Sequence, residues 1–147
     1  MAAAAFKKLL QVSKGTAAAA GGTFTADFPI PTDRVVRAEV YGFLTAKPGG
    51  SIIAASMFAE GVYANAGGTV SAVTAFTGGA NPQSAAALVG SRAQASDAAF
   101  TGGGGTPPTL VLSVSSTNVR ATITNNSASA QAADATIYFE CTLAGTT

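Results

Sequence analysis

The sequence predicts an all-β protein: an antiparallel β-sandwich or jelly-roll-like fold with an extended N-terminal arm. Two observations support this fold class. In several segments apolar residues alternate with polar ones at a period of two, which is typical of strands with one buried face. These segments recur about every ten to fifteen residues, and turns rich in Gly, Pro and Asn separate them. We expect residues 1–23 to form the arm with its linker, and residues 24–147 to form a single sandwich domain.

The clearest strands lie near the C-terminus, where residues 109–126 and 135–143 predict three antiparallel strands. A polar four-residue loop joins the first two strands and suits a hairpin built round a type I turn, with Val114 opposite Val119. In this loop we expect Asn118 to adopt a left-handed conformation, which Asn tolerates. The polar stretch between the second and third strands is interpreted as a surface loop.

Earlier strands are predicted in four segments: residues 24–30, 35–45, 51–63 and 69–77. In the third of these, Ile52 and Ile53 interrupt the alternation, which predicts a β-bulge, although the alanine content also fits a short helix. Residues 84–100 fit either a strand or a helix, because Ala favours the helix and Val the strand.

The composition indicates a small core and a weakly charged surface. The apolar content of 48% includes 33 alanines among 147 residues, so the large side chains that build a core are few. A core of this kind is more often stabilised by association with other chains than alone. The net charge of +1 and the absence of clustered Lys or Arg argue against nucleic-acid binding. Copies with so few charges repel one another little.

We expect no membrane partner and no signal peptide. No apolar run reaches the length of a transmembrane helix. The first residues superficially resemble a targeting segment, but Lys7 and Lys8 follow the alanines instead of preceding an apolar core.

Catalysis and metal binding find little support among the residue types. The chain has no histidine, which excludes Ser-His-Asp and Cys-His arrangements and imidazole metal sites. Its seven carboxylates form no evident pair and no Asp-x-Asp pattern, and its glycine run lacks the Lys-Ser or Lys-Thr of a phosphate loop. Cys141, the one cysteine, is expected to be a small buried apolar residue. We therefore expect no enzyme, no catalytic residue, no cofactor and no metal.

The candidate docking residues lie in the N-terminal arm: Phe6, Lys7, Lys8, Leu9 and Leu10. The apolar members fit one face of a helix, whereas Leu10 and Val12 fit a strand. A Gly- and Ala-rich linker follows, which would allow the arm to reach a neighbouring subunit and add a strand to its sheet. The alternative is that the arm folds back on its own domain.

The candidate subunit-contact residues lie on one face of the 35–45 strand: Arg37, Tyr41 and Phe43. A charge beside aromatic rings favours an interface, although a bent strand that switches sheets explains the pattern too. Tyr41, Tyr63 and Tyr138 are the candidate exposed aromatic residues. Sugar-binding modules use such rings, but tyrosines at sandwich edges with their hydroxyl in water are commoner.

Three stretches carry a resemblance to a known family: LVLSVSSTNVRATITNN, ATIYFECTL and VVRAEVYGFL. They resemble strands of small structural proteins of tailed bacteriophages, over about half of the chain. The resemblance implies a β-sandwich virion component that assembles as an oligomer. Capsid decoration (cement) proteins of such particles are commonly trimers at capsid symmetry axes, and tail and fibre proteins share the sandwich style.

We therefore expect a non-enzymatic virion structural protein, foremost a capsid decoration protein that forms a trimer and stabilises the head shell. The expected partners are further copies of the chain and the major capsid protein or another virion protein. The expected location is the virion, on the capsid surface rather than the tail, after assembly in the host cytoplasm. The alternative is a tail-tip or fibre module that binds a host receptor or glycan.

Overall fold

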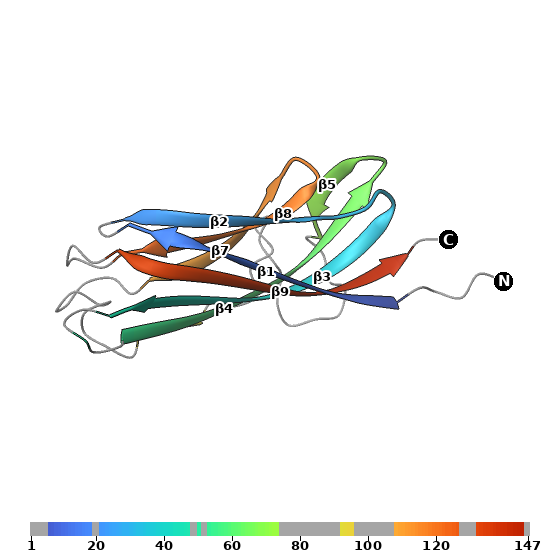
Figure 1. Ribbon diagram of the computed structural model, residues 1–147. Coiled ribbons are helices and arrows are strands. Elements are labelled where there is room, and N and C mark those ends of the chain that lie inside the picture. The colour runs from blue at the N-terminus through green and yellow to red at the C-terminus, as the bar shows by residue number, and fades with distance from the viewer. Residues whose placement is uncertain are drawn as a thin grey trace.

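The computed structural model describes residues 6–18, 21–47, 50, 53–73, 92–95, 108–126 and 132–145. All strands in this part of the chain belong to two antiparallel sheets, and no α-helix occurs among these residues. The two sheets pack face to face, as Figure 1 shows. The all-β sandwich that the sequence predicts is therefore confirmed.

The large sheet has six strands, whose main path runs β1–β9–β3–β4–β5, with β6 also paired to β4. Its strands are β1 (Phe6–Ala17), β9 (Ala133–Gly145), β3 (Arg34–Ala46), β4 (Ile53–Ala66), β5 (Thr69–Ala72) and β6 (Arg92–Ala95). β9 lies between β1 and β3, so segments from opposite ends of the sequence are neighbours in this sheet (Figure 1).

The small sheet has three strands in the order β2–β8–β7: β2 (Gly22–Pro29), β8 (Asn118–Asn125) and β7 (Thr109–Ser115). β7 and β8 form the predicted hairpin, with Val114 opposite Val119. The turn is tighter than expected, because Ser115 still pairs with Asn118. Ser116, and not Asn118, has the positive φ, at 55°.

The third C-terminal strand exists but belongs to the other sheet. After β8 the chain crosses from the small sheet to the large one, where β9 becomes an inner strand. Every second residue of β9, from Ala133 to Leu143, is buried. Alternation of apolar and polar residues shows that one face of a strand is buried, but it does not show which strand lies beside it. The sequence pattern of β9 would therefore be the same in either sheet.

Residues 6–17 do not extend from the body as an arm. They form β1, an edge strand of the large sheet, and pair along their whole length with β9. The helical interpretation is wrong for these residues, and the fold-back alternative is right. Gln11 also connects this edge to the small sheet, since its Nε2 donates a hydrogen bond of 2.8 Å to the backbone oxygen of Asp27 on β2.

β4 is a regular strand over its described length. Its pairing with β3 continues without interruption from Ile53 to Asn65, so the helical alternative is wrong for these residues. Ile52, the first residue of the predicted bulge, lies outside the described residues. Small residues obscured the alternation, because Ala55, Ala59 and Gly61 occupy its buried side. β5 lies at the start of the predicted 69–77 strand. Residues 74–91 and 96–107, with the rest of that strand and most of the uncertain 84–100 segment, lie outside the described residues.

The core lies between the two sheets and is built from the alternate residues of each strand. Phe139 of β9 and Phe28 of β2 meet across it, with ring centroids 5.6 Å apart. Gly42 allows close packing, since a Cβ at this position would lie 3.0 Å from Cδ1 of Ile123. Cys141 is buried, as predicted.

Candidate interaction surface

One side of the large sheet faces away from the small sheet and is called the outer face. It carries the alternate residues of β1, β9, β3 and β4 whose neighbours point into the core. The pairing register arranges these residues in rows that run across the strands. Directly opposite side chains in such a row are close enough to interact, with Cβ atoms about 5 Å apart.

The aromatic row contains one residue from each of the four strands: Val12, Tyr138, Tyr41 and Phe58. The ring of Tyr41 lies 5.2 Å from that of Phe58 and 6.1 Å from that of Tyr138, and both pairs are tilted. Tilted rings at these distances attract each other beyond the burial of their area. Burial raises the pKa of Tyr41, with a smaller contribution from Glu39 and Glu140, so its phenol stays neutral.

Exposed apolar side chains surround the aromatic row. Leu10 is 61% exposed, Val12 52% and Phe43 43%, and all three lie on the outer face. In the described part of the chain, the other large hydrophobic residues with comparable exposure are Val111 and Val114, which lie in the β7–β8 hairpin of the small sheet. The outer face therefore carries the more extended apolar surface.

The acidic row lies next to the aromatic row and contains a glutamate on each of three adjacent strands: Glu140, Glu39 and Glu60. Such neighbours repel one another, and two cations offset the repulsion. Arg37 Nη2 lies 3.2 Å from Glu60 Oε2, and Arg37 Nε lies 3.7 Å from Glu39 Oε1. Lys8 forms an ion pair with Glu140, and the hydrogen bond between them raises the pKa of Lys8.

The outer face contains five of the eight contact residues that the sequence suggested: Lys8, Leu10, Arg37, Tyr41 and Phe43. Two candidate sets, one from the arm and one from the 35–45 strand, thus form part of one surface. Lys7 and Leu9 point to the other side of β1, where Leu9 packs against the core. Phe6 begins β1 opposite Ala144.

Sequence reasoning missed the residues that complete the rows: Val12, Phe58 and Glu60. The alternation along each strand indicates which face a residue occupies. It does not indicate the register between strands that are distant in the sequence. Tyr138 was a candidate exposed ring and does lie in the aromatic row. Tyr63 was also expected to be exposed, and this is wrong: it is fully buried, because it shares the core-facing parity of Met57 and Ala59.

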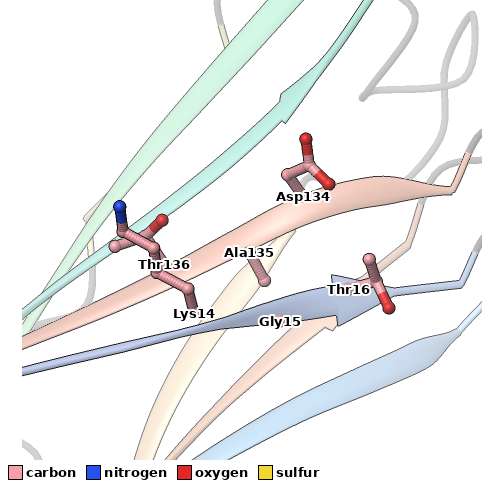
Figure 2. A pocket seen from close by; sticks show the side chains of 6 residues that line it. All are labelled: Lys14, Gly15, Thr16, Asp134, Ala135 and Thr136. Carbon is pink, nitrogen blue, oxygen red and sulfur yellow. The ribbon is translucent and has the colours of Figure 1, made fainter.

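A shallow polar depression lies toward one end of the outer face, with a volume of about 480 Å³. Its lining comes from the adjacent strands β1 and β9: Lys14, Gly15, Thr16, Asp134, Ala135 and Thr136. Figure 2 shows Lys14 beside Thr136, with Asp134 further along β9. Phe43 lies opposite Thr136 on β3, which places an exposed ring near the polar groups.

Among the described residues, the titratable groups form no metal cluster, and the thiol is buried. No three His, Cys, Asp or Glu residues in the described ranges are placed to hold a metal ion. Burial raises the pKa of the Cys141 thiol to about 12, which keeps it protonated and unreactive. None of the described residues forms a helix long and apolar enough to cross a membrane. The outer face presents apolar side chains and charged groups to its surroundings.

No protein-family model matches this chain, and no curated protein matches it. Among solved structures, the chain is similar to the tailspike protein of Acinetobacter baumannii phage AM24, with a TM-score of 0.44 and 13% sequence identity. The alignment covers 93% of this chain and 26% of the tailspike chain. The chain therefore spans about a quarter of the length of that protein.

Proposed function

We propose that this protein is a non-enzymatic structural component of a tailed-bacteriophage virion, foremost a capsid decoration (cement) protein. The observation that carries the proposal is the outer face, which combines the aromatic row with exposed aliphatic side chains on one side of the sandwich. Soluble monomers rarely expose extended apolar surface, and larger patches mark sites of interaction. In a protein that functions within an assembly, such a face would be covered by a neighbouring subunit.

The composition and the resemblance support the same role. Only 8 basic and 7 acidic residues in 147 leave little repulsion between closely packed copies. The C-terminal strands resemble those of phage structural proteins. We propose a homo-oligomer, a trimer, that binds the major capsid protein or another virion protein on the capsid surface. Because β1 is paired with β9 in the large sheet, we propose that Lys8 and Leu10 contact a partner from the outer face and not from a free arm.

The proposal also fits assembly in a host cytoplasm. The chain has one cysteine, which is buried and unpaired, so its stability does not depend on an oxidising compartment.

Binding to protein-only head shells tests this function. Purified chain is mixed with expanded shells of the phage that encodes it, after the shells have been stripped of accessory proteins. We expect the chain to sediment with the shells at a fixed ratio and to raise their melting temperature, because a ligand of the native state stabilises it. Shells that neither retain the chain nor melt later would refute the decoration role.

The polar depression favours a second candidate function, a tail-tip or fibre module that binds a host glycan. Lys14, Asp134 and two threonine hydroxyls provide donors and acceptors, and Phe43 provides an apolar ring nearby. Sugar sites commonly combine a ring with a few polar groups. Binding to host-surface polysaccharide that is lost in Asp134→Ala, with no affinity for head shells, would select this function over decoration.

A further inference from the structure

One side of β1 has no neighbour in the large sheet. β9 pairs with the other side along the whole strand, and no further described strand pairs with β1. In an antiparallel pair, the N–H and C=O groups of alternate residues point away from the partner strand. From Lys7 to Thr16, none of these outward groups bonds to another group in the described part of the chain. This side of β1, from Lys7 to Thr16, is called the free edge and presents a row of open backbone donors and acceptors.

The free edge lacks the features that protect the edge strand next to it. The register of β1 with β9 runs through 12 residues without a bulge, and β1 contains no proline. β2, the edge strand of the small sheet, ends at Pro29, and the carbonyl of its Asp27 already accepts a hydrogen bond from Gln11. A regular, unprotected edge is a template on which a further strand can pair.

The charges of β1 determine which strand fits this edge. β1 contains three lysines and no acidic residue. Lys8 is already paired with Glu140, whereas Lys7 and Lys14 form no ion pair within the described structure. Asp134 lines the same depression as Lys14, but in the register with β9 it lies opposite Thr16. Two cations near the ends of the free edge therefore have no counter-ion among the described residues.

The same lysines disfavour pairing between two copies of β1. Each added copy would bring three more lysines and no carboxylate to the edge. Like charges brought together in an interface cost stability, and lysines are a common means of suppressing contact between sheet edges. An acidic strand would instead gain from the charges that keep copies of the chain apart.

We propose that the free edge of β1 binds an extended acidic segment of a partner virion protein as an additional antiparallel strand. The inference rests on the virion role of the proposed function and names the kind of segment that the chain recognises. Antiparallel pairing continues the pattern of the large sheet and is the more stable arrangement per residue. Carboxylates opposite Lys7 and Lys14 supply the missing counter-ions. β-Branched residues opposite Leu10 and Val12 pack beside these exposed side chains.

The alternation along β1 sets the spacing of the acidic residues in the bound segment. Leu10, Val12 and Lys14 lie on the outer face, and Lys7 lies on the other side of the strand. An antiparallel segment therefore carries an acid opposite Lys14, β-branched residues two and four positions later, and a second acid seven positions after the first. Small polar residues suit the remaining positions, because the small sheet ends at β2 and leaves that side of the added strand in water.

A peptide of this pattern tests the pairing: Ac-Glu-Thr-Val-Thr-Val-Thr-Thr-Glu-NH2. In NMR titrations of the full chain, we expect it to bind and to slow the hydrogen exchange of those β1 amides that point away from β9. The matched control replaces the central Thr-Val by Pro-Pro, which keeps both acids but removes two neighbouring N–H groups, one of which must face β1. It is expected to give no such protection. Binding of the first peptide without slower exchange of these amides would overturn the proposal.

Charge reversal tests the role of the lysines. We expect Lys7→Glu/Lys14→Glu to bind the acidic peptide about tenfold more weakly than wild type, since two exposed ion pairs are lost. A peptide with Lys at both ends should show the opposite preference and bind this variant better than wild type, which also shows that the variant is folded. Lys47→Glu, which changes an exposed lysine beyond the end of β3, is the control and should bind the acidic peptide as wild type does. Equal affinity of both peptides for wild type would overturn the proposal.

Head-shell binding separates this inference from the proposed function. Shells that retain wild type and Lys7→Glu/Lys14→Glu equally well overturn the edge contact and leave decoration standing. A chain that binds the acidic peptide at β1 but ignores the shells supports the edge contact and refutes decoration. If the outward amides of β1 become protected as the concentration of the chain alone is raised, the edge pairs with a second copy, and the proposal is overturned.

Discussion

Asp27 and Arg120 face each other across β2 and β8 and form a bidentate ion pair, with Nε 2.8 Å from Oδ1 and Nη2 2.8 Å from Oδ2. The pair lies on the outside of the small sheet and is half-exposed. It connects the edge strand of that sheet to its central strand. Its geometry makes the stability of the protein depend on pH.

The hydrogen bonds from Arg120 lower the pKa of Asp27 below its ordinary value of 3.8, and burial opposes them in part. The pair therefore stabilises the fold fully above the pKa of the unfolded state, and this contribution is lost as the pH falls through the lower folded pKa. We expect Asp27→Asn to lower the melting temperature slightly at neutral pH and to match wild type in strong acid. Melting curves across the acid range check this, and a difference from wild type that persists unchanged into strong acid would contradict it.

Tyr63 carries a buried hydroxyl that has no hydrogen-bond partner in the described structure. An unsatisfied buried polar group costs about 1–3 kcal/mol, so Tyr63→Phe is expected to raise the free energy of unfolding by about 1 kcal/mol. Urea denaturation measures the change. Burial raises the pKa of this phenol to about 12, so wild type should also lose stability above pH 10, where the unfolded phenol ionises. A destabilised Phe variant would contradict this account.

Asn65 ties the β4–β5 turn to the end of β2. Its Nδ2 donates to the backbone oxygen of Ile30 at 2.7 Å, and its Oδ1 accepts from the backbone nitrogen of Gly68 at 3.0 Å. Asn65→Ala leaves the buried carbonyl without its donor, and we expect a loss of about 2 kcal/mol in the free energy of unfolding. Asn65→Asp keeps the acceptor but cannot donate when ionised, so it should not restore stability. If Asn65→Asp had the wild-type free energy of unfolding, the hydrogen bond from Gly68 alone would account for the contribution of Asn65, which would contradict this prediction.

Gly42 lies under the side chains of Ile123 and Leu110, which would be 3.0 Å and 3.4 Å from a Cβ at this position. Gly42→Ala overfills this part of the core, and we expect it to destabilise the protein by about 1–2 kcal/mol. Ile123→Val removes the nearest methyl group. In a double-mutant cycle the two substitutions should therefore cost less together than the sum of their separate costs. If the two losses in the free energy of unfolding were additive, the strain in Gly42→Ala would not come from contact with Ile123.

Cys141 offers a probe of the native state. Its thiol is buried and its pKa is raised to about 12, so the reactive thiolate is nearly absent at neutral pH. A thiol reagent such as Ellman's should react only as fast as the protein opens. The rate should rise with urea in step with unfolding, and prompt reaction in buffer alone would mean that β9 opens locally.

The sequence predicted those features of the fold that depend on neighbours along the chain. The β7–β8 hairpin follows from alternation on both sides of a short polar loop, and the two faces of β3 follow from parity. The large sheet joins strands whose pairing partners are far apart in sequence, and period two says nothing about them. For this reason the pairing of β9 with β1 and β3 could not be predicted from the sequence.

The sequence predicted two separate sets of contact residues and not one surface, because it does not show how distant strands pair. Arg37, Tyr41 and Phe43 share a parity, and so do Lys8 and Leu10, but only the register with β9 shows that both sets belong to one face. Tyr63 was misplaced because its strand is rich in Ala and Gly. Because β4 has few large side chains, the sequence gives only a weak indication of which of its faces is buried.

The position of β9 has a consequence for the order of folding. β9 follows every other described strand in the chain and yet lies between β1 and β3, so neither strand has its partner on that side until β9 has left the ribosome. During synthesis β1 lacks its whole pairing partner, while β3 and β4 are able to form their hairpin early. Closure of the large sheet is then a late, long-range step, which is intrinsically slow. A nascent chain of this protein exposes unpaired strand edges until that step, so crowded translation favours mispairing between copies.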